Sequence, residues 1–318
     1  MDLGDLTIDA RRLWACEAPW DGPIAFVDLD ASAMAPDALA LPPCPVVGFG
    51  DPAHPLAGRL DAMVEAPVSA DAVIAQVLVA PRAAAVFVQL LRILPSLSPD
   101  EGLTAESMAY ALLQGSQEHA AWIAARRGEA GSRTPGCVAT TREGDRLIVT
   151  MDHPESGNTI DRAMRDGLYE AFSLAAIDPE IARVSLRASG RTFSLGAELG
   201  EFGTTLDPAT AHAIRCRTLP ARAALGCADR LDVHVQGACV GAGLELAAYG
   251  RRVTGAPDAW FQLPELAMGI LPGAGGCVSL SRRIGRQRTA LLVLSGKRLS
   301  ARHALAWGLV DAIVDEAA

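Results

Sequence analysis

A glycine-broken turn between a strand-like run and a helix-like run is the feature that most restricts how this chain can fold. The turn is Gly241-Ala242-Gly243 within VHVQGACVGAGLELA, and Glu245 follows it in the first helical turn. Backbone N–H groups at a helix start lack partners inside the helix, so they can bind a developing negative charge. Glycines that enter a helix also often serve close packing, and a first-turn glutamate often complements the helix dipole. The turn by itself leaves both interpretations open.

A second glutamate stands in an apolar segment twenty residues later. Glu265 follows Pro264 and precedes the apolar run 266–271, where an unpaired carboxylate is costly to bury. The glycine-rich sequence PGAGG comes next, at residues 272–276. Two carboxyls offer proton transfer, and a bare helix start offers stabilisation of an oxyanion. Together they predict a site for chemistry beside a carbonyl group.

Motifs in the second half of the chain follow the order and spacing of a known enzyme family. VQGACVGAGLELA is followed by FQLPELAMGILPGAGG, with RTFSLGAEL before them at residues 191–199 and LSGKRLSARHALAWGLVDAIV after them at residues 294–314. From about Gly136 to its C-terminus the chain resembles the crotonase (enoyl-CoA hydratase/isomerase) superfamily. The resemblance implies a crotonase-like spiral of ββα units, whereas periodicity alone predicts only an α/β class.

The resemblance also implies which residues hold and activate a thioester. Its two oxyanion-hole donors fall on the backbone N–H groups of Ala197 and Ala242. Its two acid/base carboxyls fall on Glu245 and Glu265. Ala242 stands where glycine is more common, but the backbone donor is kept if the local φ and ψ suit alanine. The further substrate-binding residues that it implies are Ser194, Leu195, Gly196, Gly241, Gly243, Pro264 and Gly273.

A further position departs from the family pattern. Asn158 occupies the family's asparagine place in the loop MDHPESGNTID, but Gly157 replaces the basic residue that commonly precedes it. The departure weakens one expected contact with coenzyme A.

The pair of glutamates favours hydration among the reactions of the family. Members that add water across the 2,3 double bond of an enoyl-CoA have both glutamates, whereas isomerases often keep only the one at the Glu265 position. One carboxyl then holds and deprotonates water, and the other exchanges a proton with the α-carbon. The alternatives are isomerase, decarboxylase, thioester hydrolase or cofactor-free oxygenase activity, or a CoA-ester-binding protein without catalysis. We expect no cofactor beyond the coenzyme A of the substrate.

The residues before the matched region divide into two segments. Residues 1–68 alternate short β-like runs with proline-rich connectors, which predicts a small α/β lobe. Residues 69–130 are helical in pattern, with helices over 70–79 and 81–94 and a third from the Ser98 cap to about residue 126. The apolar residues of the third helix include Leu103, Met108, Ala111 and Leu112. The polar stretch 128–135 predicts a linker to a crotonase-like core over 136–318.

The core is expected to begin with a hairpin, in which CVATTR and RLIVTM are joined by the turn Glu143-Gly144-Asp145. A helix over about 160–176 should follow, because Met164, Leu168, Phe172 and Ala175 fall on one helical face.

The helical segment resembles the one that usually closes a crotonase chain at its C-terminus. Here the chain stops at Ala318, just after GLVDAIV, where those helices would begin. We hypothesise that the terminal helices stand at the front of this chain and cover the site. Arg126 and Arg127 would then lie near the CoA phosphates. The alternative is an ordinary helical hairpin with a solvated basic end.

Composition argues against several other functions. A formal net charge of −9 disfavours nucleic-acid binding, which requires clustered Lys and Arg. The histidines and cysteines lack metal-ligand spacing, which predicts no metal site and reduced thiols in a cytoplasmic protein. We expect Cys239 to be a small apolar residue rather than a nucleophile. No signal region or membrane-spanning run occurs. The resemblance implies a homotrimer or a dimer of trimers that acts on an acyl-CoA substrate.

Overall fold

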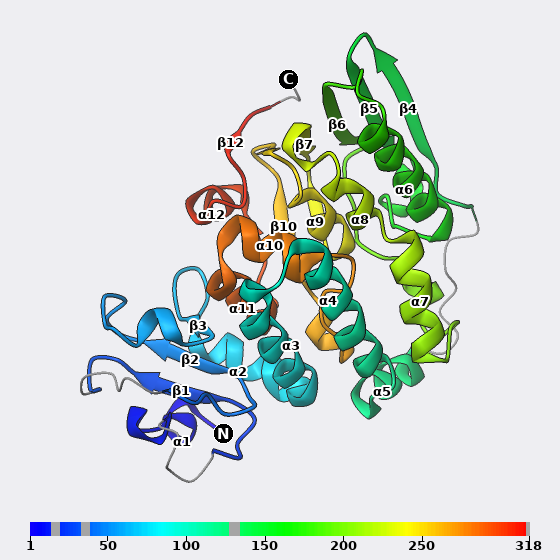
Figure 1. Ribbon diagram of the computed structural model, residues 1–318. Helices are drawn as coiled ribbons and strands as arrows, with labels where there is room; N and C mark the ends of the chain where they lie inside the picture. The colour runs from blue at the N-terminus through cyan, green and yellow to red at the C-terminus, as the bar shows by residue number, and fades with distance from the viewer. Residues whose placement is uncertain (14–19, 33–38, 127–133, 316–318) are drawn as a thin grey trace.

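The computed structural model describes residues 1–13, 20–32, 39–126 and 134–315 (Figure 1). Its strands form three sheets, and helices surround them. The helices are α1 Leu3–Leu6, α2 Ala70–Val79, α3 Pro81–Ile93, α4 Pro99–Gln114, α5 Gln117–Ala125, α6 Arg162–Ile177, α7 Pro208–Thr218, α8 Pro220–Leu225, α9 Ala242–Ala247, α10 Gly276–Ile284, α11 Arg286–Ser295 and α12 Ala301–Trp307.

The largest sheet has six strands in the order β12-β9-β7-β6-β5-β4. They are β4 Val138–Glu143, β5 Arg146–Met151, β6 Arg183–Ala188, β7 Leu231–Val235, β9 Arg252–Gly255 and β12 Ala312–Ile313. The predicted hairpin is confirmed as β4 and β5, which are antiparallel and turn at Gly144 with φ +61°. From β5 to β12 all neighbours are parallel. Helix α6 packs against β4 and β5 and buries Met164, Leu168 and Phe172, as its pattern predicts.

A smaller sheet brings the two predicted glutamate loops to one edge. Its strands β8 (Ala238–Val240), β10 (Trp260–Gln262) and β11 (Leu299–Ser300) lie in the order β11-β10-β8. Because β8 and β10 are parallel, their carboxyl ends meet at the same edge. Helix α9 starts just after β8, and a short 3-10 helix, Glu265–Met268, follows β10. The sheet thus carries Glu245 and Glu265 to the same place.

The first segment contains a three-stranded parallel sheet. Its strands β1 (Ala25–Asp28), β2 (Val46–Phe49) and β3 (Ala62–Met63) lie in the order β1-β2-β3. This agrees with the α/β pattern predicted for residues 1–68.

The second segment contains four described helices where the sequence predicts three. The Ser98 cap of α4 is confirmed, because Ser98 N–H donates to Glu101 Oε2 (2.8 Å) and Glu101 N–H donates to Ser98 Oγ (3.4 Å). The predicted extent of this helix is wrong: it ends at Gln114, and Ser116 caps a new helix, α5, by accepting from His119 N–H (3.1 Å). No single described helix is long and apolar enough to cross a membrane. The pair Ala70–Val79 and Pro81–Ser96 passes by length and composition, but it bends by 111°.

The apolar face expected for α4 is also partly wrong. The side chains of Met108 and Leu112 are exposed, at 57% and 65%. Leu103 and Ala111 are buried as expected. The buried face is rotated toward Glu106 because α4 packs against α7, α8 and α10.

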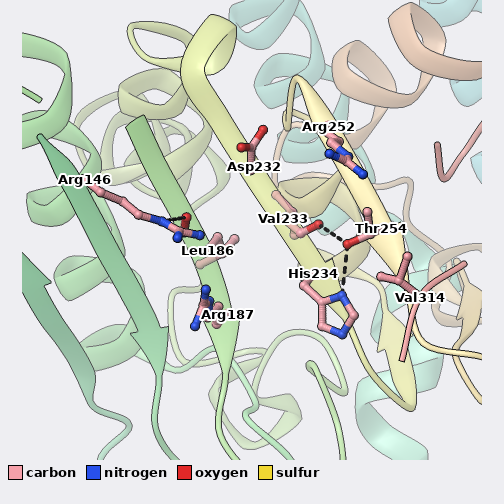
Figure 2. Close-up of a pocket in the computed structure, with 10 residues that line it drawn as sticks. Arg146, Leu186, Arg187, Asp232, Val233, His234, Arg252, Thr254 and Val314 are labelled. Carbon is pink, nitrogen blue, oxygen red and sulfur yellow. Dashed lines mark hydrogen bonds between the residues drawn. The ribbon is translucent and has the colours of Figure 1, made fainter. Parts of the chain in front are cut away.

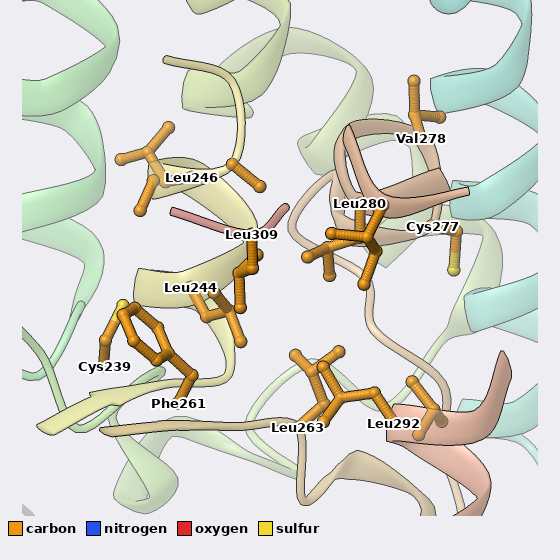
Figure 3. Close-up of a cluster of buried hydrophobic side chains, with 14 of the residues drawn as sticks. Cys239, Leu244, Leu246, Phe261, Leu263, Cys277, Val278, Leu280, Leu292 and Leu309 are labelled. Carbon is orange, nitrogen blue, oxygen red and sulfur yellow. The ribbon is translucent and has the colours of Figure 1, made fainter. Parts of the chain in front are cut away.

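One buried apolar cluster runs through all three predicted segments. It includes the fully buried Phe26 of β1, Phe87 of α3 and Phe261 of β10. Figure 3 shows the part of this cluster around Phe261, where Leu244 of α9 and Leu263 lie close by. The N-terminal segments therefore share a core with the rest of the described chain, and the division at residues 68 and 136 stays a prediction.

Candidate active site

A cavity of about 360 Å³ lies at the edge where β8 and β10 end. Helices α4 and α7 supply its opposite wall through Tyr110, Gln114, Ile214 and Arg215. The predicted site residues that line it are Leu195, Gly196, Ala197, Gly241, Ala242, Glu245, Pro264, Glu265 and Gly273. Segments widely separated in the sequence therefore meet around one space.

Backbone hydrogen bonds hold two glycine loops side by side, the loop around Gly196 and the turn at Gly241. Ser194 N–H donates to Ala238 O (3.0 Å), and Val240 N–H donates to Ser194 O (2.9 Å). Just beyond this bridge, Gly196 has φ +94° and Gly241 has φ +48°, which side-chain-bearing residues rarely adopt. A Cβ on Gly196 would lie 3.1 Å from Val240 O. The close approach of the loops therefore requires glycine.

The backbone amides of Ala197 and Ala242 both belong to the cavity wall. No described residue accepts a hydrogen bond from either N–H group. Ala242 is the first residue of α9, a position whose N–H has no intrahelical partner. Its φ is not positive, so the alanine methyl causes no backbone strain there. The amides are available for the predicted oxyanion hole, which stays a prediction.

Glu245 is held by the glycine-rich loop that follows the second glutamate. Its Oε2 accepts from Ala274 N–H (2.7 Å) and Gly276 N–H (2.8 Å). A Cβ on Gly276 would lie 2.4 Å from Glu245 Cγ, so glycine makes room for this carboxyl. Burial raises the pKa of Glu245 to about 7, and the two backbone bonds limit the rise. The group therefore titrates near neutral pH.

Glu265 has a different environment. Its Oε1 lies 2.7 Å from the position of a Cβ on Gly241, and its buried Oε2 has no hydrogen-bond partner among the described residues. Burial, and then the charge of Glu245, raise the pKa of Glu265 well above its ordinary value. Glu265 therefore favours the protonated form, whereas Glu245 has donors for its charge.

A third buried carboxyl in this region is one that the sequence analysis missed. Glu106 of α4 accepts from Gly275 N–H (2.7 Å) and Cys277 N–H (2.8 Å), one bond to each carboxyl oxygen. Glu106 and Glu245 thus share the N-terminus of α10, where the helix dipole favours negative charge. Burial, and then the charge of Glu245, raise the pKa of Glu106 to about 8.

A signal for Glu106 is present in the sequence. It lies three residues after Leu103 and four before Tyr110, and such spacing places all three side chains on one helix face. A glutamate on an apolar face is costly to bury without donors. The donors belong to α10, which no local pattern connects with α4.

Helices α4 and α5 lie over the cavity. The Tyr110 ring lies against Gly273, where a Cβ would come within 2.1 Å of Tyr110 Cδ2. From α5, His119 Nδ1 donates to Met268 O (2.8 Å), and the Trp122 ring packs edge-on against Phe202. Helix α4 therefore lines the cavity, and α5 packs against Met268 and Phe202 of its lining. Their correspondence to the family's C-terminal helices stays a hypothesis.

Two predicted substrate-binding residues do not line the cavity. Ser194 is fully buried, and its Oγ donates to Asn158 O (2.8 Å) and accepts from Gly196 N–H (3.1 Å). A Cβ on Gly243 would lie 2.5 Å from Ser194 Cβ. Ser194 and Gly243 thus support the loops from behind, and the cavity lining gives their predicted contact with substrate no support.

Of the two basic residues predicted to contact coenzyme A, Arg126 is described and is not among the residues that line the cavity. Arg126 ends α5, with its guanidinium carbon 5.1 Å from the centroid of the Trp122 ring. Arg127 lies outside the described residues, as does most of the linker predicted over 128–135. Their contact with CoA phosphates stays a prediction.

Cys239 belongs to the apolar core rather than to the site. It is fully buried in the cluster of Figure 3, and burial raises the pKa of its thiol well above the ordinary value. Because the thiolate is the nucleophilic form, this supports the expectation that Cys239 is a packing residue. Among the described residues there is no group of three or more side chains that could hold a metal ion.

A second pocket, of about 100 Å³, lies on the six-stranded sheet (Figure 2). Arg146, Arg187 and Arg252 line it, and His234 Nδ1 shares a hydrogen bond with Thr254 Oγ1 (2.9 Å). It contains none of the predicted site residues, so the candidate active site is the larger cavity.

A family model described as enoyl-CoA hydratase/isomerase matches residues 143–318, which is more than half of the chain. The chain belongs to the enoyl-CoA hydratase/isomerase family. The matched region carries Glu245, Glu265 and both glycine loops. The N-terminal helices that supply Glu106 and Tyr110 lie outside it.

Two curated relatives of this chain are hydratases. The chain is 33% identical over 165 residues to the 2,3-dehydroadipyl-CoA hydratase of Escherichia coli, covering 52% of this chain and 64% of that protein. It is 29% identical over 178 residues to the mevalonyl-coenzyme A hydratase of Beauveria bassiana, covering 54% and 64%. The chain therefore spans less than two thirds of the length of either relative.

Similarity to solved structures confirms the predicted crotonase-like fold. An enoyl-CoA hydratase/isomerase of Mycobacterium abscessus has 32% identity and a TM-score of 0.53, over 57% of this chain and 71% of that chain. The structure of DspI from Pseudomonas aeruginosa has 28% identity and a TM-score of 0.51, over 59% and 77%.

Proposed function

We propose that this protein hydrates enoyl-CoA thioesters by adding water syn across the 2,3 double bond. The observation that carries the proposal is a single cavity lined by two unbonded backbone amides and two glutamates in unlike environments. Neither feature alone would select this reaction, because either occurs in sites of other kinds.

The amides would act on the thioester carbonyl. A carbonyl oxygen between Ala197 N–H and Ala242 N–H could take up negative charge, and loss of one such donor costs about 3–4 kcal/mol of barrier. Drawing charge onto the oxygen opens the β-carbon to attack by water. It also lets the α-carbon accept a proton as the enolate collapses.

The two glutamates would divide the proton transfers. Glu245, with two donors for its charge, would hold water and take its proton as the oxygen bonds to the β-carbon. Glu265, kept protonated by burial, would give a proton to the α-carbon. The balance is one water consumed and one 3-hydroxyacyl-CoA formed, with the proton of Glu245 returned to Glu265 through solvent or product release. Both carboxyls line one cavity, which favours syn addition.

The names of the relatives also favour hydration, because one acts on 2,3-dehydroadipyl-CoA and another on mevalonyl-coenzyme A. We further propose that coenzyme A enters as part of the substrate with no other cofactor, and that Arg126 and Arg127 lie near its phosphates. We also propose that the protein is cytoplasmic and assembles as a homotrimer or a dimer of trimers.

Crotonyl-CoA tests the proposed reaction. Purified protein should remove the enone absorbance and form 3-hydroxybutyryl-CoA. Glu245→Gln and Glu265→Gln should each lower kcat by about 10²- to 10⁴-fold. Glu170→Gln, an exposed change on α6, is the matched control and should leave kcat unchanged.

Other outcomes of this assay would replace the proposal. Conversion of 3-enoyl-CoA without hydration would make the protein an isomerase. Release of free coenzyme A would make it a hydrolase. Tight binding of CoA esters without turnover would make it a non-catalytic binding protein.

A further inference from the structure

Three arginines line the cavity, and none has a part in the proposed hydration. Arg162 pairs with Glu201 and Arg165 pairs with Asp166, whereas no described carboxylate pairs with Arg215. Arg215 of α7 stands beside Tyr110 and Gln114 of α4, and its guanidinium carbon lies 4.5 Å from the centroid of the Tyr110 ring. Burial raises the pKa of Tyr110, and the charges of Glu245 and Glu265 add to the rise. The Tyr110 ring also lies against Gly273, whose neighbour Ala274 donates to Glu245, so Tyr110 contacts both Arg215 and the loop that holds this carboxyl.

The partners of Arg215 are all electrically neutral. Its Nε–H donates to Ser107 Oγ (3.0 Å), its Nη1 to Gln114 Oε1 (2.9 Å) and its Nη2 to Ser107 O (3.2 Å). A guanidinium has five N–H groups, so two have no acceptor among the described residues. No described carboxylate forms an ion pair with Arg215, and both oxygens of the nearby Glu106 are occupied by backbone amides of α10.

Arg215 is therefore a cation without a carboxylate in contact among the described residues. Burial disfavours the charged guanidinium and lowers the pKa of Arg215, and the charges of Tyr110 and Glu106 offset this only in part. A carboxylate that entered the cavity would offset that cost and could accept two parallel N–H bonds. An apolar chain end would leave both spare donors without acceptors.

We propose that Arg215 binds a terminal carboxylate of the acyl chain, so that the preferred substrates are enoyl-CoA esters of dicarboxylic acids. The inference rests on the proposed function for the thioester and concerns the other end of the same cavity. The carboxylate would lie a few carbon atoms beyond the double bond, because the Tyr110 ring contacts Arg215 as well as Gly273 of the loop that holds Glu245.

Binding of saturated esters tests this without turnover. Calorimetry would compare glutaryl-CoA and adipyl-CoA with valeryl-CoA and hexanoyl-CoA, which have the same chain lengths but no carboxylate. A charge-assisted pair predicts about tenfold or tighter binding of the carboxylated ester. Free coenzyme A reports any contact of Arg215 with phosphate instead.

Three variants and one control locate the effect. Arg215→Leu should abolish the preference, and Arg215→Lys should keep part of it. Gln114→Glu would place a protein carboxylate on the guanidinium and should also abolish the preference, while the contact between α4 and α7 remains. Arg217→Leu, an exposed change on the same helix, should keep the preference. Thermal unfolding would verify that each variant is folded.

Equal binding of carboxylated and plain esters by the unaltered protein would overturn the inference. Equal weakening of all ligands, including free coenzyme A, in Arg215→Leu would overturn it too, because Arg215 would then bind the coenzyme A portion. A carboxylate preference without hydration would refute the proposed function and leave this inference standing. Hydration of crotonyl-CoA without the preference would do the reverse.

Discussion

One wall of the cavity presents mainly main-chain groups, whereas the other presents side chains. The first wall, from residues 195–199 and 240–276, presents main-chain amides and two glutamates that each lie next to a glycine. The other wall, from α4 and α7, presents side chains, and Glu106 of α4 reaches an amide 169 positions away in the sequence. The comparison teaches that local sequence can position reacting groups, whereas long-range packing sets the electrostatics around them.

The first test concerns the main-chain wall and should have the largest effect. Gly276→Ala would place a Cβ 2.4 Å from Glu245 Cγ, so the carboxyl must move. Displacement of a proton-transfer group by about 1 Å lowers kcat by about 100-fold. Gly58→Ala, at an exposed site with nothing within 4 Å of the new methyl, should have no effect. Steady-state kinetics with crotonyl-CoA measure both, and an unchanged kcat in a folded Gly276→Ala protein would mean that Glu245 does not depend on this glycine.

The pH dependence of activity tests whether the glutamates differ as their surroundings indicate. Hydration should rise about tenfold per pH unit as Glu245 loses its proton, with an apparent pKa near 7, and should fall at higher pH as Glu265 loses its proton. The two values belong to the coupled pair. Values of kcat/KM measured across the pH range give the profile. Glu245→Gln should lose the increase of kcat/KM with pH around pH 7. A rate independent of pH would contradict these roles.

The pH dependence of stability tests the environment of Glu106, on the side-chain wall. The folded-state pKa of Glu106 is about 8 against an ordinary 4.5, so unfolding releases its proton between these values. The free energy of unfolding should therefore fall as pH rises through that window, with the contribution complete below it and lost above it. Glu106→Gln should reduce the slope by up to about 1.4 kcal/mol per pH unit. Urea unfolding at several pH values measures the slope. If the slope of Glu106→Gln equals that of the control Glu170→Gln, the pKa of Glu106 is not raised in the folded protein.

The smallest effect should come from Arg126, which follows α5 and does not line the cavity. A surface charge pair contributes about 0.2–1 kcal/mol, so Arg126→Ala should weaken coenzyme A binding by less than about sixfold. Calorimetry with coenzyme A and 3′-dephospho-coenzyme A, at low and high salt, measures the change. A loss greater than tenfold would make Arg126 a principal phosphate contact, and no loss would remove it from the site.

Predictions from short-range patterns agreed well with the structure. The hairpin around Gly144, the buried face of α6 and the Ser98 cap each depend on residues within a few positions of one another. The errors fell where a partner far along the chain decides the outcome. Periodicity placed Met108 and Leu112 on the apolar face of α4, but contact with α7 and α10 leaves them exposed.

By itself, the sequence determined the crotonase-like class, the two glycine turns and the choice of Glu245 and Glu265 as candidate site residues, because all of these depend on contiguous motifs. Only the tertiary structure decided that α4 lies over the cavity, that Glu106 shares the start of α10 with Glu245, and that Arg215 lines the same space with spare donors. The physical reason is that the burial and the electrostatic environment of a side chain depend on which surfaces pack together. For helices far apart in the chain, no local sequence pattern indicates that packing.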